Sequence, residues 1–276
     1  MAQQSGRSEL SLCISIVTYK VHPDDFTAML ASLDAALEAA EASWRLRTRL
    51  IIVDNGGQEA QLRELLGDYP ALPVELVVNT ENVGYGRAQN QALAMAQCDY
   101  HVVMNPDVVV QPECLLRGLN YLEREADVVA LSPEVTDIRG CLQYLCKCYP
   151  AVLDLALRGF APRGLRQAFA RRLALYECRS MVDKRLTARA ELISGCFMLI
   201  RGEALRAVGG FNERFFLYFE DFALSIELAR HGRLMYYPPM AIVHYGGHAA
   251  RKGAEHIRMF TRSAVSFFNL YGWKLF

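Results

Sequence analysis

Four runs of apolar, mostly β-branched residues mark the first 105 residues of the chain, at 10–19, 49–55, 74–79 and 100–105. Between these runs apolar residues recur at helical spacing, most clearly at Phe26, Leu30, Leu33 and Leu37. Strands that alternate with helices predict a parallel sheet with right-handed crossovers. We therefore expect an α/β fold with a mostly parallel central sheet flanked by helices.

The second half of the chain has a less regular pattern. The segment "ISGCFMLIRGEAL" predicts a strand that leads into a helix, and 209–232 predicts a loop followed by a helix. The segment "RLMYYPPMAIVHY" predicts two short strands broken at Pro238 and Pro239, because proline cannot donate to a strand ladder. Apolar spacing over 254–273 predicts a final helix. We find no internal repeat and no linker, so we expect one domain.

The apolar run "HVVMNPDVVVQ" is interrupted by Asn105, Pro106 and Asp107. A parallel strand that is buried on both faces should be almost continuously hydrophobic. A turn is one explanation, since proline and aspartate are common in turns. The alternative is a metal site at the end of a strand, because Mg²⁺ is often held by one or two carboxylates together with substrate phosphates.

Polar residues recur where the predicted strands end, at Thr18–Tyr19, Asp54–Asn55, Asn79 and Asn105–Asp107. In open α/β sheets, ligands bind outside the carboxyl ends of the strands. Four strand ends that offer polar groups to one edge of the sheet predict a binding site there.

The segment "NTENVGYGRAQNQAL" places Gly84 and Gly86 just before a predicted helix. Such glycines allow close approach of a ligand to the backbone, and the helix N-terminus favours an anion such as a phosphate. A dinucleotide fingerprint would need a third glycine at Gln89, so a plain turn capped by Asn82 is an equal alternative. Asp54 could bind a ribose hydroxyl or a base N–H, or could simply form a turn.

The segment "FFLYFEDFALSIELARHG" contains the acidic pair Glu220–Asp221 directly after a run of aromatic residues. An apolar wall raises the pKa of a carboxyl group and favours its use as a general base. Alternatively, the pair stabilises the first turn of a helix through its dipole. His244 ends a predicted strand and could be a metal ligand or a structural residue.

Composition narrows the function classes. Lys plus Arg and Asp plus Glu both number 30, so the neutral chain gives no indication of a nucleic-acid partner. No apolar run is long enough for a membrane span, and "MAQQSGRSEL" lacks the apolar core of a signal peptide. We therefore expect a cytoplasmic protein. Without a well-spaced set of four ligands, the eight cysteines predict reduced thiols, with Cys13, Cys98 and Cys196 in the core.

Residues 154–190 carry nine Lys and Arg residues against three Asp and Glu residues. Leucine and phenylalanine residues are interleaved with these charges. Basic amphipathic segments lie on anionic membrane surfaces, which predicts peripheral contact with a membrane. The alternative is an ordinary helical insert that packs on the sheet with its arginines in water.

Five features together resemble a family 2 glycosyltransferase with the GT-A fold: "VDN" (53–55), "NVGYGRAQN" (82–90), "NPDV" (105–108), "GGFNERFFLYFEDFAL" (209–224) and His244. The form of these motifs is most similar to the rhamnosyltransferase branch. The resemblance implies an inverting transfer of a sugar, best assigned as L-rhamnose from dTDP-rhamnose. It implies a bacterial cell-surface glycan, a lipopolysaccharide or a lipid-linked molecule as acceptor, at the inner face of the plasma membrane.

The resemblance also implies a division of the single domain and a role for each site residue. Residues 10–110 would bind the nucleotide sugar, 111–250 the acceptor, and 251–276 would form a C-terminal helix. The base and ribose would be held by Thr18, Tyr19 and Asp54. The rest of the donor pocket would be formed by Asn55, Asn82, Gly84, Gly86, Asn90, Asn105 and Gly195. A divalent cation, Mg²⁺ or Mn²⁺, would be bound by Asp107, with His244 as a further ligand. Asp221 would be the catalytic base, and Glu220 its neighbour.

Two rival functions are open at this point. A nucleotidyltransferase that makes sugar nucleotides can share this architecture, but such enzymes usually have a glycine-rich loop after the first strand, where this chain has "TYKVHPDD". A non-catalytic relic that only binds nucleotide sugars is the second rival, and the presence of both Asp107 and Asp221 argues against it. The pattern leaves the oligomeric state open.

Overall fold

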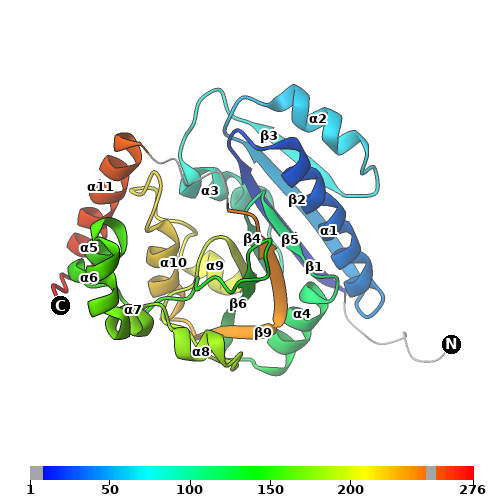
Figure 1. Cartoon of the computed structure of the whole chain (residues 1–276). Helices are drawn as coiled ribbons and strands as arrows, with labels where there is room; N and C mark the ends of the chain where they lie inside the picture. The colour runs from blue at the N-terminus through cyan, green and yellow to red at the C-terminus, as the bar shows by residue number, and fades with distance from the viewer. Residues whose placement is uncertain (1–8, 247–252) are drawn as a thin grey trace.

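The computed structural model describes residues 9–246 and 253–276 (Figure 1). All four strands expected in the first half are present, as β1 (Leu10–Thr18), β2 (Leu46–Asp54), β3 (Val74–Val78) and β4 (Tyr100–Met104). They pair in parallel in the order β3-β2-β1-β4. The helices between them are α1 (Pro23–Glu41), α2 (Glu59–Gly67) and α3 (Tyr85–Met95). The expectation of an α/β fold is therefore confirmed.

β1, β4 and the second half of β2 are largely apolar because helices cover both faces of this part of the sheet. On one face, side chains such as Leu12 and Ile14 pack in a cluster with α1 and with α4 (Cys114–Arg124). On the other face, Cys13 and Val53 pack against Ala88 of α3. The two apolar faces fix the strands in register, so their carboxyl ends meet at one edge.

The second half of the chain extends the same sheet with β5 (Val108–Val110), β6 (Val128–Thr136), β7 (Ala188–Arg189), β8 (Phe197–Arg201) and β9 (Arg233–His244). The full order is β3-β2-β1-β4-β8-β6-β9-β5, and β7 pairs with β9. Of the nine strands, β1 to β4, β6 and β9 run in one direction, and β5, β7 and β8 run against them. The sheet is therefore mixed, with a purely parallel part at the β3 end.

The expectation of two strands separated by Pro238 and Pro239 is wrong, because β9 runs through both prolines. Its pairing with β6 shifts at this point, so that Ser132 lies opposite Tyr236 but Glu134 already lies opposite Ala241. The prolines fall in this bulge, where no N–H group is needed for the ladder. The backbone stays extended, and the strand continues to His244.

The remaining helices are α5 (Val152–Phe160), α6 (Arg163–Ala168), α7 (Ala170–Tyr176), α8 (Arg179–Asp183), α9 (Gly202–Ala207), α10 (Glu220–Leu228) and α11 (Ala254–Tyr271). The final helix agrees with the sequence prediction. Figure 1 shows α11 beside α5, at the end of the molecule away from α1 and α2. An aromatic cluster joins α11 to the loop before α10, with Phe267 of α11 at 5.2 Å from Phe219 between ring centroids.

All eight cysteines are free thiols, and the three that we expected in the core are buried. Cys13 and Cys98 lie beside His101, with the three possible ligand atoms within 4.8 Å of one another. The sequence spacing did not predict this cluster. Across 9–246 and 253–276, we find no helix with the length and apolar character needed to cross a bilayer.

Candidate active site

The carboxyl ends of β1 and β2 bring together four residues that the sequence predicted as binding residues. Thr18 and Asp54 are register partners at the last position of each strand, and both are fully buried. Asn55 is also buried, whereas the Tyr19 side chain is 53% exposed beside them. The strand edge thus carries buried polar groups with one aromatic ring open to solvent.

Asp54 uses both of its carboxylate oxygens to hold the following turn. Oδ1 accepts a hydrogen bond from the N–H of Gly56 at 2.9 Å, and Oδ2 accepts one from Gln58 at 2.7 Å. Gly56 is required here because a Cβ atom would lie 2.7 Å from the backbone nitrogen of Lys20. This geometry matches the turn-forming alternative for Asp54, and a contact with a ribose or base stays a prediction.

Asn55 is the centre of a network of side-chain amides that shapes the glycine-rich loop. Its Nδ2 donates to Asn82 Oδ1 at 2.8 Å, and its Oδ1 accepts from Asn79 at 3.1 Å and from the N–H of Val83 at 3.0 Å. The loop then turns at Gly84, whose φ of 88° is strongly disfavoured for other residues. The loop conformation is therefore set before any ligand binds.

Two other residues of this motif face the second half of the chain. Asn90 forms paired hydrogen bonds with the backbone of Phe211, each 2.8 Å long. Gly86 lets α3 approach α10, since a Cβ atom there would lie 3.2 Å from Phe211 Cβ and 3.7 Å from Glu220 Cβ. The structure thus places Asn90 and Gly86 at the contact between α3 and the segment before α10, where they fix the position of Glu220.

Asp107 and His244 lie together although 136 residues separate them in the sequence. Pairing of β5 with β9 sets Val108 opposite His244, which brings His244 Nε2 to 3.5 Å from Asp107 Oδ2. The N–H of Gly246 donates to the same carboxylate oxygen at 3.1 Å. Asn105 lies at the start of this turn, and its Oδ1 accepts a hydrogen bond from Tyr85.

Gln143 determines which nitrogen of His244 can bind a ligand. Its Nε2 donates to the carbonyl oxygen of His244 at 3.0 Å, so its Oε1 is left to accept from Nδ1 at 2.9 Å. With the proton on Nδ1, the lone pair of Nε2 points at the Asp107 carboxylate. A nitrogen and an oxygen atom whose lone pairs face each other could together bind a divalent cation. The hydrogen bond from Nδ1 to Gln143 is also typical, because metal-binding histidines usually donate their other N–H group to an oxygen atom.

Glu220 and Asp221 form the first turn of α10. Asp221 accepts hydrogen bonds from the N–H groups of Gly195 at 3.1 Å and Phe222 at 2.9 Å, and burial raises its pKa. Glu220 is buried, and one of its carboxylate oxygens has no hydrogen-bond partner among the described residues. Burial, together with the negative charge of Asp221, raises the pKa of Glu220 to about 8. At neutral pH, the pair therefore carries mainly one negative charge.

The backbone before this pair is strained. Tyr218 and Phe219 have φ values of 72° and 68°, a region that bulky residues rarely adopt. Each such conformation costs about 1–3 kcal/mol and persists only where the surrounding structure enforces it. Here the aromatic cluster with α11 holds Phe219, so the fold maintains a costly conformation next to two buried carboxyl groups.

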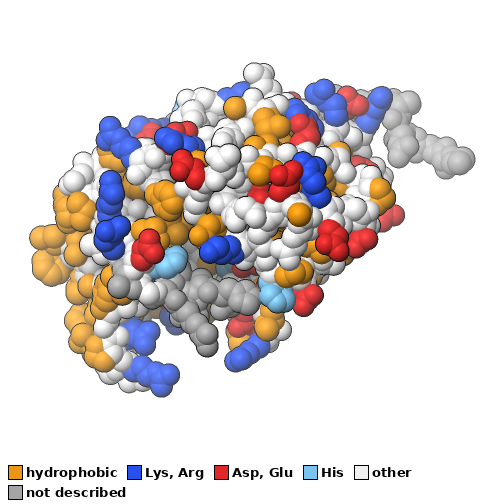
Figure 2. Space-filling model, turned by 90° about the horizontal axis from the view of Figure 1, so that it is seen from above, with side chains coloured by type: hydrophobic (Ala, Val, Ile, Leu, Met, Phe, Trp, Pro, Cys, Tyr) orange, Lys and Arg blue, Asp and Glu red, His pale blue; other side chains and the backbone are white. Residues whose placement is uncertain are grey.

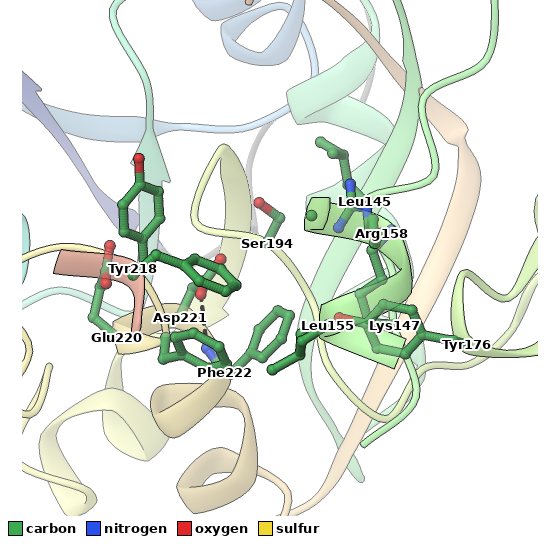
Figure 3. A pocket seen from close by; sticks show the side chains of 13 residues that line it. Leu145, Lys147, Leu155, Arg158, Tyr176, Ser194, Tyr218, Glu220, Asp221 and Phe222 are labelled. Atoms are coloured by element: carbon green, nitrogen blue, oxygen red, sulfur yellow. Dashed lines mark hydrogen bonds between the residues drawn. The ribbon is translucent and has the colours of Figure 1, made fainter. Parts of the chain in front are cut away.

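A pocket of about 400 Å³ opens in front of Asp221 (Figure 3). Tyr218, Glu220, Asp221 and Phe222 form one side of it, and Leu145, Lys147, Leu155, Arg158 and Tyr176 form the other. Ser194 lies between the two sides. The volume is that of a small-molecule site, and acidic and basic groups face each other across an apolar and aromatic lining.

Comparison with known proteins identifies the family. The model of glycosyl transferase family 2 matches residues 13–206, which is more than half of the chain. The chain belongs to glycosyl transferase family 2. Its motifs at 53–55, 82–90 and 105–108 lie within the matched segment, and the acidic pair and His244 lie beyond it.

Two curated relatives are rhamnosyltransferases. The N-acetylglucosaminyl-diphospho-decaprenol L-rhamnosyltransferase of Mycobacterium tuberculosis (strain ATCC 25618 / H37Rv) is 28% identical over 273 residues, which cover 93% of this chain and 83% of the relative. Rhamnosyltransferase WbbL of Escherichia coli (strain K12) is 25% identical over 210 residues, which cover 73% and 74% of the two chains. The resemblance to the rhamnosyltransferase branch is confirmed.

Two solved structures share the fold. GalNAc-T7 with UDP, GalNAc and Mn²⁺ has a TM-score of 0.61 at 13% identity, and the match covers 85% of this chain and 43% of that one. The mannosyltransferase PcManGT from Pyrobaculum calidifontis with GDP-Man and Mn²⁺ has a TM-score of 0.59 at 17% identity, with coverage of 92% and 60%. This chain thus spans less than two thirds of either solved chain, and the likeness supports the GT-A fold alone.

Three residues of this family 2 member escaped the sequence analysis. Tyr85 donates to the carbonyl oxygen of Gly195 at 3.0 Å and also contacts Asn105, so it joins the loop that holds Asp221 to the turn that holds Asp107. Gln143 and Lys147 lie in the segment "CLQYLCKC" (141–148), between cysteines that the sequence predicts as reduced thiols. The lysine among apolar residues and cysteines was a usable signal, but the partner of Gln143 is 101 residues away.

Proposed function

We propose that this chain is an inverting, metal-dependent glycosyltransferase that moves L-rhamnose from dTDP-rhamnose to a lipid-linked sugar. The observation that carries this proposal is Asp221, a partly buried carboxylate at the wall of a pocket, held by the N–H of Gly195. The two rhamnosyltransferase relatives support the choice of sugar, and the relative named for N-acetylglucosaminyl-diphospho-decaprenol supports the choice of acceptor.

In the proposed reaction, the carboxylate of Asp221 takes the proton from an acceptor hydroxyl group. The acceptor oxygen forms a bond to the anomeric carbon of the sugar, and the bond between that carbon and the nucleoside diphosphate breaks on the opposite face. Because the new bond forms opposite the departing group, the configuration inverts. One carboxylate base is sufficient for this reaction, unlike glycoside hydrolysis, which needs two carboxyl groups.

The neutral state of Glu220 supports the role of Asp221. With a pKa of about 8, Glu220 stays mainly protonated at pH 7 and adds little negative charge beside the base. Burial raises the pKa of Asp221, which makes its carboxylate a stronger base than an exposed aspartate. Asp107 and His244 would hold a divalent cation, which would supply Lewis-acid stabilisation of charge on the departing diphosphate.

A donor screen tests the proposed function. Purified protein is incubated with dTDP-rhamnose, UDP-sugars or GDP-sugars and a short-chain N-acetylglucosaminyl-diphospho-prenol, with Mg²⁺, Mn²⁺ or EDTA. We expect transfer from dTDP-rhamnose that stops in EDTA, and a product whose anomeric configuration, determined by NMR, is opposite to that of the donor. Donor binding without transfer to the acceptor would identify a relic, and transfer of another sugar would exclude rhamnose as the substrate.

We also propose that the end of the molecule formed by α5, α6, α7 and the C-terminal residues touches an anionic membrane. Large exposed hydrophobic side chains lie there, namely Phe160, Leu165, Phe169, Leu175, Trp273, Leu275 and Phe276. In Figure 2, hydrophobic and basic side chains occur side by side along this end. Basic residues interleaved with exposed apolar ones suit the interface of a membrane, where a lipid-linked acceptor would reside.

The ion pairs reduce the charge that this surface offers. Arg172 pairs with the buried Asp154 at 2.6 Å, and Arg158 and Arg179 share Glu177. Among the described residues, Arg163, Arg166 and Arg171 have no carboxylate within 4.0 Å and are exposed. These three arginines are the ones that support a membrane contact.

Co-sedimentation with anionic vesicles tests this contact. We expect binding at low salt that weakens at high salt and in a variant with Arg163, Arg166 and Arg171 changed to glutamine. Arg172 is left intact because its loss would leave Asp154 buried without a partner. If the wild-type protein stays in the supernatant at low salt, the surface is not a membrane contact.

A further inference from the structure

Lys147 is a buried cation without an anionic partner. The residue is 3% exposed to solvent, which is among the lowest values for charged residues. Its Nζ donates a hydrogen bond to the carbonyl oxygen of Tyr144. Nζ also lies 5.9 Å from the centroid of the Tyr176 ring. In the part of the chain that the structure describes, no carboxylate lies within 4.0 Å of Nζ. A buried ammonium group in this state is costly unless an anion joins it.

The backbone fixes this lysine at the pocket. Lys147 and Leu192 exchange two backbone hydrogen bonds, each 3.0 Å long, which tie the lysine to the segment that leads to Ser194 and Gly195. Burial lowers the pKa of Lys147 to about 8, so it is still mainly charged at pH 7. The side chain lines the pocket opposite Asp221 (Figure 3). The charge is thus preformed and faces the space that the acceptor would enter.

Arg158 of α5 adds a second cation to the same wall. Its Nε lies 3.4 Å from Glu177, but Arg179 binds the same carboxylate more closely, at 2.6 Å. Arg158 and Arg179 thus share the single carboxylate of Glu177, and Lys147 adds a further positive charge to the same wall of the pocket. Arg158 is half-exposed, so it can turn toward a ligand at little cost.

We propose that Lys147 and Arg158 bind the phosphate of an acceptor whose sugar carries a phosphate or diphosphate at its anomeric carbon. This inference rests on the proposed function, because it assumes that the pocket in front of Asp221 receives the acceptor. The acceptor sugar would lie on the aromatic lining, with its reacting hydroxyl at Asp221 and its phosphate at the two cations. Charge-assisted hydrogen bonds of this kind are the strong ones in recognition of phosphate.

The donor also carries an anion, its diphosphate. The residues that line the pocket distinguish the site of the acceptor phosphate from the site of the donor diphosphate. Neither Asp107 nor His244 is among the described residues that line this pocket. If the donor diphosphate binds at that candidate metal pair, the cations across from Asp221 have no role toward it. The acceptor is then the substrate that can supply an anion to Lys147.

The test uses soluble probes and needs no turnover. Calorimetry in EDTA compares N-acetylglucosamine 1-phosphate with methyl N-acetylglucosaminide, which lacks the phosphate. We expect the wild-type protein to bind the phosphate-bearing probe more tightly. Lys147→Met and Arg158→Gln should each weaken that binding by about 10- to 100-fold and leave the methyl glycoside unchanged. Lys184→Met, which removes an exposed lysine outside the pocket, should change neither affinity.

Several outcomes would overturn the proposal. Equal losses for both probes, or no loss in either variant, would show that the cations do not bind the acceptor phosphate. Weaker binding of dTDP in these variants, with unchanged binding of the sugar phosphate, would assign the two cations to the donor diphosphate. Because Arg158 is half-exposed, its variant carries the test if circular dichroism shows that Lys147→Met is unfolded. Lys147-dependent binding of the sugar phosphate without any rhamnose transfer would support this inference while contradicting the proposed function.

Discussion

The strand ends of the parallel half and the pocket in front of α10 differ in how their buried polar groups are paired. At the strand ends, Asp54 and Asn55 have their side-chain oxygens bonded to backbone N–H groups or to a neighbouring amide. In the pocket, the described residues offer no partner to one oxygen of Glu220, and none of them places a carboxylate within 4.0 Å of Lys147 Nζ. The strand ends are complete without a ligand, whereas the described pocket residues leave charges that a ligand can neutralise.

The difference indicates which interactions are structural and which are available to a substrate. A buried polar group costs about 1–3 kcal/mol when its partner is missing, so a stable fold keeps few of them. One of those that remain, Oε2 of Glu220, lies next to the strained backbone at Tyr218 and Phe219. Substitutions at the strand ends should therefore change stability, and substitutions in the pocket should change activity.

The largest expected effect comes from removing the carboxylate of the pocket. We expect Asp221→Asn to slow sugar transfer by about 10²–10⁴-fold, because an amide cannot accept the proton of the acceptor hydroxyl. Donor affinity, measured by calorimetry, should change by no more than a factor of a few. Asp68→Asn, at an exposed position after α2, is the matched control. Transfer near the wild-type rate in Asp221→Asn would move the role of base to Glu220.

Gln143 has features of both regions. Its side chain is hydrogen-bonded, like the residues at the strand ends, but it would affect metal binding through His244. We expect Gln143→Ala to weaken Mn²⁺ affinity by about 10- to 100-fold, because the imidazole loses the partner that fixes its proton on Nδ1. Titration of Mn²⁺ in the presence of a nucleoside diphosphate measures this effect, and Gln143→Glu should restore much of it. Unchanged Mn²⁺ affinity in the alanine variant would remove His244 from the ligands.

Asn55 tests the strand ends directly. We expect Asn55→Ala to lower the free energy of unfolding by about 1–3 kcal/mol, because Asn79 Nδ2 and the N–H of Val83 lose their acceptor. Urea unfolding followed by circular dichroism gives this value, and an unchanged m-value would show that the effect is on stability. Asn82→Ala, at an exposed position of the same network, should cost less. If both variants are as stable as the wild type, the comparison between the two regions fails.

The pH dependence of stability tests the neutral state of Glu220. The pKa of Glu220 is raised from 4.5 to about 8, so the folded state keeps a proton that the unfolded state loses between these values. The free energy of unfolding therefore falls as pH rises through this window, and the loss is complete above about pH 8. We expect Glu220→Gln to raise Tm by a few degrees at pH 9 and to change it little at pH 4. Equal shifts at both pH values would contradict a buried neutral Glu220.

The sequence allowed prediction of those parts of the fold that depend on local pattern. β1, β4 and the second half of β2 were found because they are buried on both faces and are therefore largely apolar. The edge strand β3 is less buried, and its Val and Leu residues still predicted a strand. The sequence did not predict that β9 is a single strand. A bulge between Ser132 and Glu134 in the pairing with β6 accommodates Pro238 and Pro239, and the sequence of β9 alone does not reveal such a bulge.

Among the site residues, the sequence predicts those that stand at strand ends or in short motifs, such as Asp107, Asp221 and Asn90. It did not predict the hydrogen bonds between Asn90 and Phe211, which lies 121 residues further along the chain. Gln143 is held by a hydrogen bond to His244 of β9, and Lys147 is held by backbone pairing with Leu192. Such contacts depend on tertiary structure, which the residue pattern of a single sequence does not reveal.

The contact between Phe219 and Phe267 also sets an order of events during synthesis of the protein. The ribosome makes the parallel half first. Its strands can pair before the residues after position 110 have been synthesised. The loop that carries Glu220 and Asp221 depends on an aromatic residue that is added 48 positions after Phe219. A growing chain can thus fold its strand ends early, but the strained loop is secured only when α11 has emerged and docked.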